Sequence, residues 1–304
     1  MKIVYSSHYD INFGGLEKLH PFDSKKYSRA WKRVPELHDL KISVPGPAAD
    51  ETLLTVHKLD YLESLKSATT LAQALELAII AKLPVTLTNM AVLRPMRYGV
   101  AGTLLGAQAA LEEGLVFNLS GGYHHAKPNT GEGFCLFNDI AIAINAVCGP
   151  DDTALYVDLD AHMGNGVAHC FLNDPRVKHF DMYNGDIYPH WDIDARDRID
   201  GRHKLKMGTP SKVYMETLQA ELPGFLDAHT PARIAIYNAG TDPYFGDSLG
   251  GLKLSVDAIL ERDLFVLEQL RQRNLPTLVL PSGGYSEASH RMIATTLSEA
   301  ARRF

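Results

Sequence analysis

Apolar runs that are typical of buried strands recur along the chain, and stretches with helical spacing separate them. Strands are predicted at residues 2–6, 115–120, 154–160, 177–183, 233–240 and 275–284. Strands that alternate with helices in this way predict an α/β fold, with a central, mostly parallel sheet and helices on both faces.

Capping and breaking residues mark the ends of several intervening segments. Residues 98–114 are predicted as a helix that Gly114 closes, and residues 70–82 as a helix that Pro84 ends. Further helices are predicted from Asn138, near 164–172, over 212–228, over 255–273 with Ser255 as the cap, and at the C-terminus.

Two polar segments carry less regular structure. Residues 12–34 are predicted as a loop followed by a helix that Asp23 or Ser24 caps, and residues 184 to about 210 as a long loop rich in Asp, Gly and Pro. Because the chain has no internal repeat, low-complexity tract or Pro/Ser linker, a single domain over 1–304 is the simpler interpretation.

Composition narrows the class of protein. The 304 residues are 45% hydrophobic and 22% charged, as in an ordinary globular protein with a substantial core. A net charge of -6 argues against a nucleic-acid partner, which usually requires a basic face. Three cysteines without a CxxC motif argue against a disulfide framework and favour a reducing, cytoplasmic compartment. No apolar run is long enough to span a membrane, and the N-terminus lacks the pattern of a signal peptide.

Residues that can bind a metal or move protons follow four of the predicted strands. These segments are "VFNLSGGYHH" with His124 and His125, "LYVDLDAHMGNG" with Asp158, Asp160 and His162, "IAIYNAGTDPYFGD" with Asp242, and "LVLPSGGY" with Tyr285. The carboxyl ends of parallel strands share one edge of a sheet, where α/β proteins bind their ligands. The sequence therefore predicts one site at that edge.

Asp160, His162 and Asp242 form a plausible zinc set. Two carboxylates and one imidazole fill three tetrahedral positions and leave the fourth open, as a catalytic zinc site requires. Each residue alone has a simpler explanation, because an Asp after a strand is often a helix cap and a single His is often a buried imidazole. Their combination at two strand ends favours a metal.

His124 and His125 would raise the number of zinc ligands to five, so acid–base catalysis is the better interpretation of the pair. Each ring then needs a partner for its second nitrogen, and Asp158 and Asn165 are the candidates on the neighbouring strand end. A solvated loop is the alternative, against which the flanking glycines argue.

Aromatic residues complete the candidate site. The Tyr285 hydroxyl can donate to a developing oxyanion, although a Tyr beside two glycines is more often a packed turn residue. Phe134 and Tyr188 can line a narrow apolar channel, although isolated aromatic residues more often belong to the core.

Together these motifs resemble the zinc-dependent histone deacetylase superfamily. The resemblance rests on "GGYHHA...GFCLFND", "YVDLDAHMGNG", "AGTDPYFGDSLGGLKLS" and "PSGGY" in matching order and spacing across 120–285. The segments "IVYSSHYDINFGGLEKLHPFDSKKY", "VHKLDYLESLK" and "DMYNGDIYPH" look most like its class IV branch.

The resemblance implies an arginase–deacetylase-type fold and hydrolysis of an N-acyl amine, most often acyl-lysine. It makes Asp160, His162 and Asp242 the ligands of one catalytic Zn²⁺. It makes His124 and His125 the carriers of the protons of the attacking water and the leaving amine, with Tyr285 binding the carbonyl oxygen. Phe134, Tyr188, Gly133 and Gly284 would line the substrate tunnel.

The resemblance also implies structural potassium sites. One would involve Asp158, Asp160, His162, Asp181 and Met182, although Asp181 stands where many relatives have a hydroxyl residue. A second would involve Phe171, Asp174 and Val177, mainly through backbone. Asn165 stands where some relatives have Asp; an amide orients His125 but does not stabilise its imidazolium, so His125 is predicted to be the less basic histidine.

Other functions remain open at the level of sequence. A small-molecule amidohydrolase, such as an acetylpolyamine deacetylase, would use the same residues. The related two-manganese ureohydrolases need further Asp ligands that "DAHMGN" and "GTDPYFGD" lack. An inactive acyl-lysine-binding module is disfavoured because every expected zinc, His and Tyr position is present. The expected substrate is an acyl-lysine peptide, an acyl-lysine protein or a small acylated amine. The protein itself is expected to be a monomer or a simple homo-oligomer.

Overall fold

A single parallel sheet forms the centre of the molecule. The computed structural model describes residues 1–12, 23 and 25–304, and within them eight strands lie in the order β2-β1-β3-β8-β7-β4-β5-β6, with every neighbouring pair parallel. The strands are β1 (Lys2–Tyr5), β2 (Lys41–Ser43), β3 (Leu115–Asn118), β4 (Ala154–Asp158), β5 (Val177–Asn184), β6 (Gly201–Leu205), β7 (Ile234–Asn238) and β8 (Thr277–Leu280).

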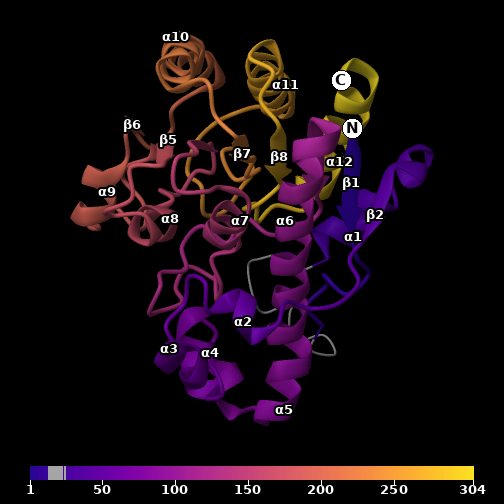
Figure 1. Cartoon of the computed structure of the whole chain (residues 1–304), viewed down its shortest axis with the longest axis vertical. Coiled ribbons are helices and arrows are strands. Elements are labelled where there is room, and N and C mark those ends of the chain that lie inside the picture. The colour runs from indigo at the N-terminus through magenta and orange to yellow at the C-terminus, as the bar shows by residue number, and fades with distance from the viewer. Residues whose placement is uncertain (13–22, 24) are drawn as a thin grey trace.

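Helices cover both faces of this sheet (Figure 1). One face packs against α1 (Lys26–Trp31), α10 (Ser211–His229), α11 (Val256–Gln272) and α12 (Ser289–Arg303). The other packs against α6 (Arg94–Glu113), α7 (Asp139–Val147) and α8 (Asn165–Cys170). Successive side chains of a strand point to opposite faces of the sheet. Leu155 and Val157 therefore pack in the core on the α10–α11 side, and Tyr156 packs in the core on the α6–α7 side.

A smaller helical lobe extends the molecule on the side where α6 begins (Figure 1). It comprises α2 (Asp50–Leu53), α3 (Leu59–Ser64), α4 (Ala68–Ala74), the 3₁₀ helix η3 (Ala78–Lys82), α5 (Val85–Thr88) and the π-helical turn η4 (Asn89–Leu93). Its own core includes Tyr61, Leu71 and Val92, and it continues onto Met96 of α6 and Phe137, so the lobe is packed firmly onto the sheet domain.

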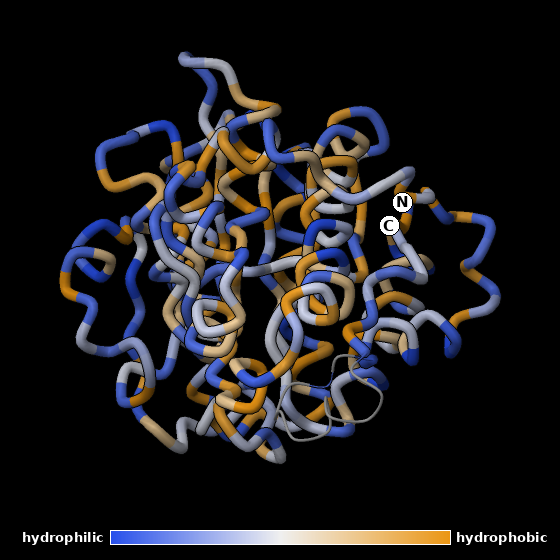
Figure 2. Tube along the Cα trace, turned by 90° about the horizontal axis from the view of Figure 1, so that it is seen from below, coloured by the Kyte–Doolittle hydropathy of each residue, from blue (hydrophilic) through white to orange (hydrophobic). Residues whose placement is uncertain are grey.

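The hydrophobic segments gather in the middle of the molecule, and many of the outermost loops are hydrophilic (Figure 2). In both views the N- and C-termini lie side by side. Among the described residues, no helix combines the length and apolar character needed to cross a membrane.

Most sequence-predicted elements are confirmed, and their caps follow the expected chemistry. Gly114 ends α6 with φ +79°, and the side chains of Asn138 and Ser255 accept hydrogen bonds from Ala141 N and Ala258 N at the starts of α7 and α11. The predicted helix over 70–82 is instead two pieces, because the chain turns at Glu76, whose φ is +53°.

Further differences between the predicted and the observed elements concern polar segments. The predicted loop from 184 to about 210 contains α9 (Ile193–Arg198) and the edge strand β6, and the other edge strand, β2, was not predicted. The 3₁₀ helix η2 (Pro35–Leu40) precedes β2. Lys25, not Asp23, occupies the N-cap position of α1, and Ser24 lies outside the described residues.

Candidate active site

The strand order brings together the four segments whose residues can bind a metal or move protons. Strands β3, β8, β7 and β4 are consecutive neighbours in the sheet, and the segments with His124, Tyr285, Asp242 and Asp160 follow their carboxyl ends. The site predicted from four separate stretches of sequence is therefore one edge of the sheet, as expected for a parallel α/β protein.

Asp160, His162 and Asp242 converge on one point. His162 Nδ1 lies 3.1 Å from Asp160 Oδ1 and 2.9 Å from Asp242 Oδ2, and all three side chains are buried. One potential ligand atom from each lies within 4.8 Å of the others. Asp242 does not cap the next helix, α11, because Ser255 does. The helix-cap explanation of Asp242 is therefore excluded.

The electrostatics of this trio favour a bound cation. Burial and the charge of Asp160 raise the pKa of Asp242 to about 7. Burial disfavours a charged imidazole, but the hydrogen bonds to Asp160 and Asp242 outweigh it and raise the pKa of His162 to about 10. A proton on His162 thus partly supplies the positive charge that the two carboxylates require. A divalent metal would supply it fully, and two carboxylates with one imidazole are donors that zinc accepts.

Two glycines leave space for the carboxylates. A Cβ at Gly283 would lie 2.2 Å from Asp160 Oδ2 and 2.7 Å from Asp242 Oδ2, and one at Gly240 would lie 2.2 Å from Asp160 Oδ2. Gly283 N also donates to Asp160 Oδ2 at 3.0 Å. The glycine of "PSGGY" therefore allows the backbone to hold a candidate metal ligand directly.

The two adjacent histidines have different partners. His124 Nδ1 lies 2.7 Å from Asp158 Oδ2, and His125 Nδ1 lies 2.7 Å from Asn165 Oδ1. Burial lowers the basicity of both rings, but Asp158 and Asp160 raise the pKa of His124 to about 9. Burial and the neighbouring His124 and His162 hold the pKa of His125 well below its usual range. The direction of this difference agrees with the sequence-based expectation.

Asn165 is itself held by a group of charged residues that sequence reasoning missed. Its Nδ2 donates to Glu132 Oε1 at 2.6 Å and to Asp192 Oδ2 at 3.0 Å. Lys127 Nζ lies 3.2 Å from the same Glu132 oxygen and 2.8 Å from the same Asp192 oxygen. The amide thus connects His125 to two carboxylates, one of which, Asp192, is distant from the histidines in sequence.

The loop that carries the histidines is fixed by α7. Asp139 accepts hydrogen bonds from Gly122 N at 2.9 Å and Tyr123 N at 2.8 Å. Gly121 and Gly122 have φ values of +81° and +75°, which glycine adopts readily. The glycines before the pair therefore shape a turn whose backbone a buried carboxylate holds.

A cavity leads to the histidine pair. Gly133, Phe134 and Tyr285 line it together with His124 and His125. The Tyr285 ring lies 5.9 Å from that of Phe134 and 6.1 Å from that of His162, between centroids. Burial raises the pKa of Tyr285 well above its usual range, so its hydroxyl keeps its proton.

Two predicted tunnel residues lie elsewhere. Tyr188 packs on His125 with ring centroids 5.0 Å apart but is not part of the cavity lining, and Gly283 lines the cavity in place of Gly284. Gly284 has φ +130° and its Cβ would collide with Thr241 Oγ1, so it shapes the turn. Tyr27 also holds this turn, donating from its hydroxyl to Ser282 O at 3.0 Å.

The cavity continues past the histidines into the helical lobe. Apolar side chains of this lobe form its far part: Leu75, Leu77, Ile80, Val92 and Met96. Sequence analysis predicted no site residue in these segments. The cavity therefore joins the polar edge of the sheet to an apolar compartment between α4 and α6.

An arginine contacts the carbonyls expected to bind a second potassium ion. Arg198 donates from Nε to Phe171 O at 2.6 Å, and from Nη2 to Asp174 O at 2.9 Å and Val177 O at 2.7 Å. The carbonyls on which that prediction rested thus accept hydrogen bonds from a guanidinium, and a potassium ion there stays a prediction.

Comparisons with known proteins agree with this geometry. Residues 20–301 match the Histone deacetylase domain family. The chain is 41% identical to "Histone deacetylase 2" of Arabidopsis thaliana over all of this chain and 79% of that protein. It is 36% identical to an uncharacterized protein of Picosynechococcus over 64% of each chain. The crystal structure of the HDA15 HD domain has a TM-score of 0.74 at 18% identity, covering 99% of this chain and 90% of that one.

These matches cover the sheet, the helical lobe and every segment that contributes to the candidate site. The structural match shows the arginase–deacetylase fold, and the sequence matches show the relationship. The chain belongs to the histone deacetylase family, a family of deacetylases.

Proposed function

We propose that this protein is a zinc-dependent hydrolase that removes an acyl group from the side-chain amine of lysine. The observation that carries the proposal is the convergence of Asp160, His162 and Asp242 beside the histidine pair, at a cavity that Tyr285 also lines. The resemblance to the class IV branch is part of this proposal. Zinc, when bound to the trio, would act as a Lewis acid on the amide carbonyl and activate a water molecule.

The residues of the chain have separate parts in this proposal. His125, neutral because its pKa is low, accepts the proton of the attacking water and returns it to the leaving amine. His124 carries positive charge beside Asp158 and stabilises the negative charge that develops. The protonated Tyr285 hydroxyl donates to the carbonyl oxygen as it becomes an oxyanion. No covalent intermediate is required.

A panel of substrates and variants tests the proposal. The kinetic parameters kcat and KM are measured for acetyl-, octanoyl- and myristoyl-lysine peptides and for an acetylated polyamine. Tyr285→Phe should lower kcat by about 100-fold or more, because one oxyanion donor is lost. Removal of metal by a chelator should abolish turnover, and Zn²⁺ should restore it.

Each outcome decides something specific. Undiminished turnover by Tyr285→Phe, or by the chelated protein, would refute the catalytic account. Hydrolysis of the polyamine alone would replace lysine by a small amine as substrate. The apolar far part of the cavity supports activity on acyl chains longer than acetyl.

A further inference from the structure

One charged side chain of α11 reaches the backbone of both segments that carry the carboxylate ligands. Arg262 Nη1 donates hydrogen bonds to Leu159 O at 3.0 Å and to Gly240 O at 2.8 Å. Leu159 directly precedes Asp160, and Gly240 lies two residues before Asp242. The guanidinium therefore joins the two segments of the candidate metal site, although α11 supplies no member of the trio.

Arg262 makes these contacts just beyond the point where β4 and β7 stop pairing. The last paired residues are Asp158 and Asn238, and Leu159 N still donates to Asn238 O at 3.1 Å. One residue further along β4 and two further along β7, a single nitrogen atom of Arg262 binds one carbonyl from each chain. The spacing of the two chains is thus held by a side chain at the level where the metal ligands begin.

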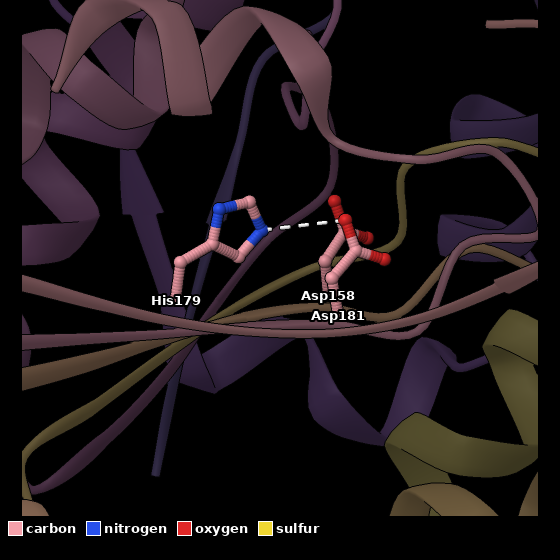
Figure 3. A group of neighbouring side chains, drawn as sticks. All are labelled: Asp158, His179 and Asp181. Carbon is pink, nitrogen blue, oxygen red and sulfur yellow. Dashed lines mark ion pairs between the residues drawn. The ribbon is translucent and has the colours of Figure 1, made fainter. Parts of the chain in front are cut away.

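On its other side β4 meets β5, and there the strands themselves and the turn before α8 close the junction. Figure 3 shows Asp158 beside Asp181, with the His179 ring directed at the two carboxylates. Asp181 Oδ2 accepts a hydrogen bond from Gly164 N at 2.8 Å, just before α8. The contact from a covering helix is therefore made on the β7 side, where the second carboxylate ligand lies.

The guanidinium is held in place by a carboxylate with several hydrogen bonds. Asp263 Oδ1 accepts from Arg262 Nε at 2.9 Å, from Arg262 Nη2 at 2.8 Å and from the Tyr237 hydroxyl at 2.6 Å. Its Oδ2 accepts from the Thr296 hydroxyl at 2.8 Å. Because the guanidinium is planar and two of its nitrogens are fixed in this way, Nη1 is directed at the two carbonyls.

Stability alone is a weak reason for an arginine at this place. Arg262 is 0% exposed and Asp263 is 3% exposed, and withdrawing two charges from water often costs as much free energy as their attraction returns. A lysine would offer one compact ammonium in place of the rigid fork of donors. What arginine adds here is a simultaneous hold on Asp263 and on two backbone carbonyls.

We infer that Arg262 is a positioning residue that sets the spacing of Asp160 and Asp242 and thereby the geometry of the metal site, an inference that rests on the proposed zinc chemistry. The segments are in close contact, since a Cβ at Gly240 would lie 2.2 Å from Asp160 Oδ2. Asp242 Oδ1 also accepts from Ala161 N at 2.9 Å. A displacement of either segment therefore moves both carboxylates.

Metal binding tests the inference without relying on turnover. The full-length protein is stripped with a chelator, its affinity for Zn²⁺ is measured by competition with a chromophoric chelator, and Co²⁺ is added to report the ligand geometry through its visible absorption. Arg262→Lys should lower the affinity for Zn²⁺ by about tenfold or more and change the Co²⁺ bands, because an ammonium cannot replace all four hydrogen bonds. Arg262→Met should lower the affinity at least as much; if it does not fold, Arg262→Lys decides alone.

Thr296→Val is the matched control, because it loosens the same buried group but leaves both bonds from Arg262 to the carbonyls in place. It should keep the affinity and the Co²⁺ spectrum of the wild type. Urea denaturation of the metal-free variants shows how far each substitution affects folding alone.

The outcomes separate this inference from the proposed function. If the Arg262 variants lost only stability and kept the wild-type affinity and spectrum, Arg262 would have a purely structural role and the inference would be overturned, while the zinc chemistry would stand. A wild-type protein that binds neither Zn²⁺ nor Co²⁺ would refute the proposed function, and the inference with it.

Discussion

Asn165 connects His125 to two carboxylates, because its amide oxygen accepts on one side and its amide nitrogen donates on the other. The oxygen faces His125 Nδ1, and the nitrogen faces Glu132 and Asp192. A carboxylate at this position would meet two acceptors and have no proton to offer them. The amide therefore suits these surroundings better than a carboxylate would.

Asn165→Asp should lower the free energy of unfolding by about 2 kcal/mol at pH 7, since like charges would be buried together. The pKa of the new carboxyl would be raised in the folded state, so the loss should grow as pH rises above about 4 and be smaller at pH 5 than at pH 7. Urea denaturation at both pH values measures this change. Asn173→Asp, at an exposed position, is the control, and equal losses at both pH values would contradict the explanation.

Gly283 is a second residue whose identity the site requires. Gly283→Ala would push a methyl group against Asp160 and Asp242, and we expect the affinity for Zn²⁺ to fall by at least about tenfold. Competition with a chromophoric chelator measures the affinity. Gly46→Ala is the control, because a Cβ at Gly46 has nothing within 4 Å. An unchanged affinity in Gly283→Ala would show that the carboxylates can move aside.

Among individual residues, the sequence predicts those site residues that belong to a recognisable metal-binding or acid–base motif. Asp160, His162, Asp242 and the partners Asp158 and Asn165 follow strand ends, where a parallel sheet must bring them together. Their supporting residues are not predictable in this way. Asp139 and Asp192 each begin a helix, where an acidic residue usually indicates a cap, and only the folded chain shows that they also hold the histidine loop and Asn165.

Among the elements, α9 is attached by its N-cap Asp192, by its buried Ala195 and by the side chain of Arg198. Arg198, at the end of α9, donates to carbonyls in the segment from the end of α8 to the start of β5. A short helix in a polar segment has little apolar surface to bury, so this guanidinium contributes much of its attachment.

Arg198→Met should lower the free energy of unfolding by about 3 kcal/mol, because three carbonyls that lie away from bulk water lose their donor. Chemical denaturation measures the change, and Arg291→Met, an exposed arginine on α12, should have an effect below about 0.5 kcal/mol. If both variants were equally stable, Arg198 would be an ordinary surface residue.

The strands that sequence analysis missed are the ones at the margins of the sheet. β2 is three residues long, and β6 alternates exposed charged residues with half-buried ones, as edge strands commonly do. Central strands such as β4 and β7 are buried at every position and give the apolar runs that pattern analysis detects.

On the scale of the whole molecule, the cavity connects the edge of the sheet with the helical lobe. Its polar end lies at the sheet edge and its apolar end in the helical lobe. No single stretch of sequence specifies such a compartment, because its wall is assembled from α4, η3, η4 and α6. Sequence patterns could predict that Ile80 or Val92 is buried, but not that each borders a cavity.

Ile80→Phe should narrow the apolar end of the cavity. We expect kcat/KM for myristoyl-lysine to fall by about tenfold relative to acetyl-lysine, because only the longer chain needs that space. Leu87→Phe, an exposed position in the same lobe, is the control and should leave the ratio unchanged. A proportional fall for both substrates would mean that the far part of the cavity does not receive the acyl chain.

The position of β8 has a consequence for how the protein is made. It lies between β3 and β7, so the last of the eight described strands in chain order joins the two halves of the sheet. Strands β4 and β7, which precede Asp160 and Asp242, can pair with each other before then. β3, which precedes the histidines, must wait about 160 residues for its second neighbour. In a nascent chain, Asp160 and Asp242 can therefore be brought together before β8 completes the sheet beside the segment that carries His124 and His125.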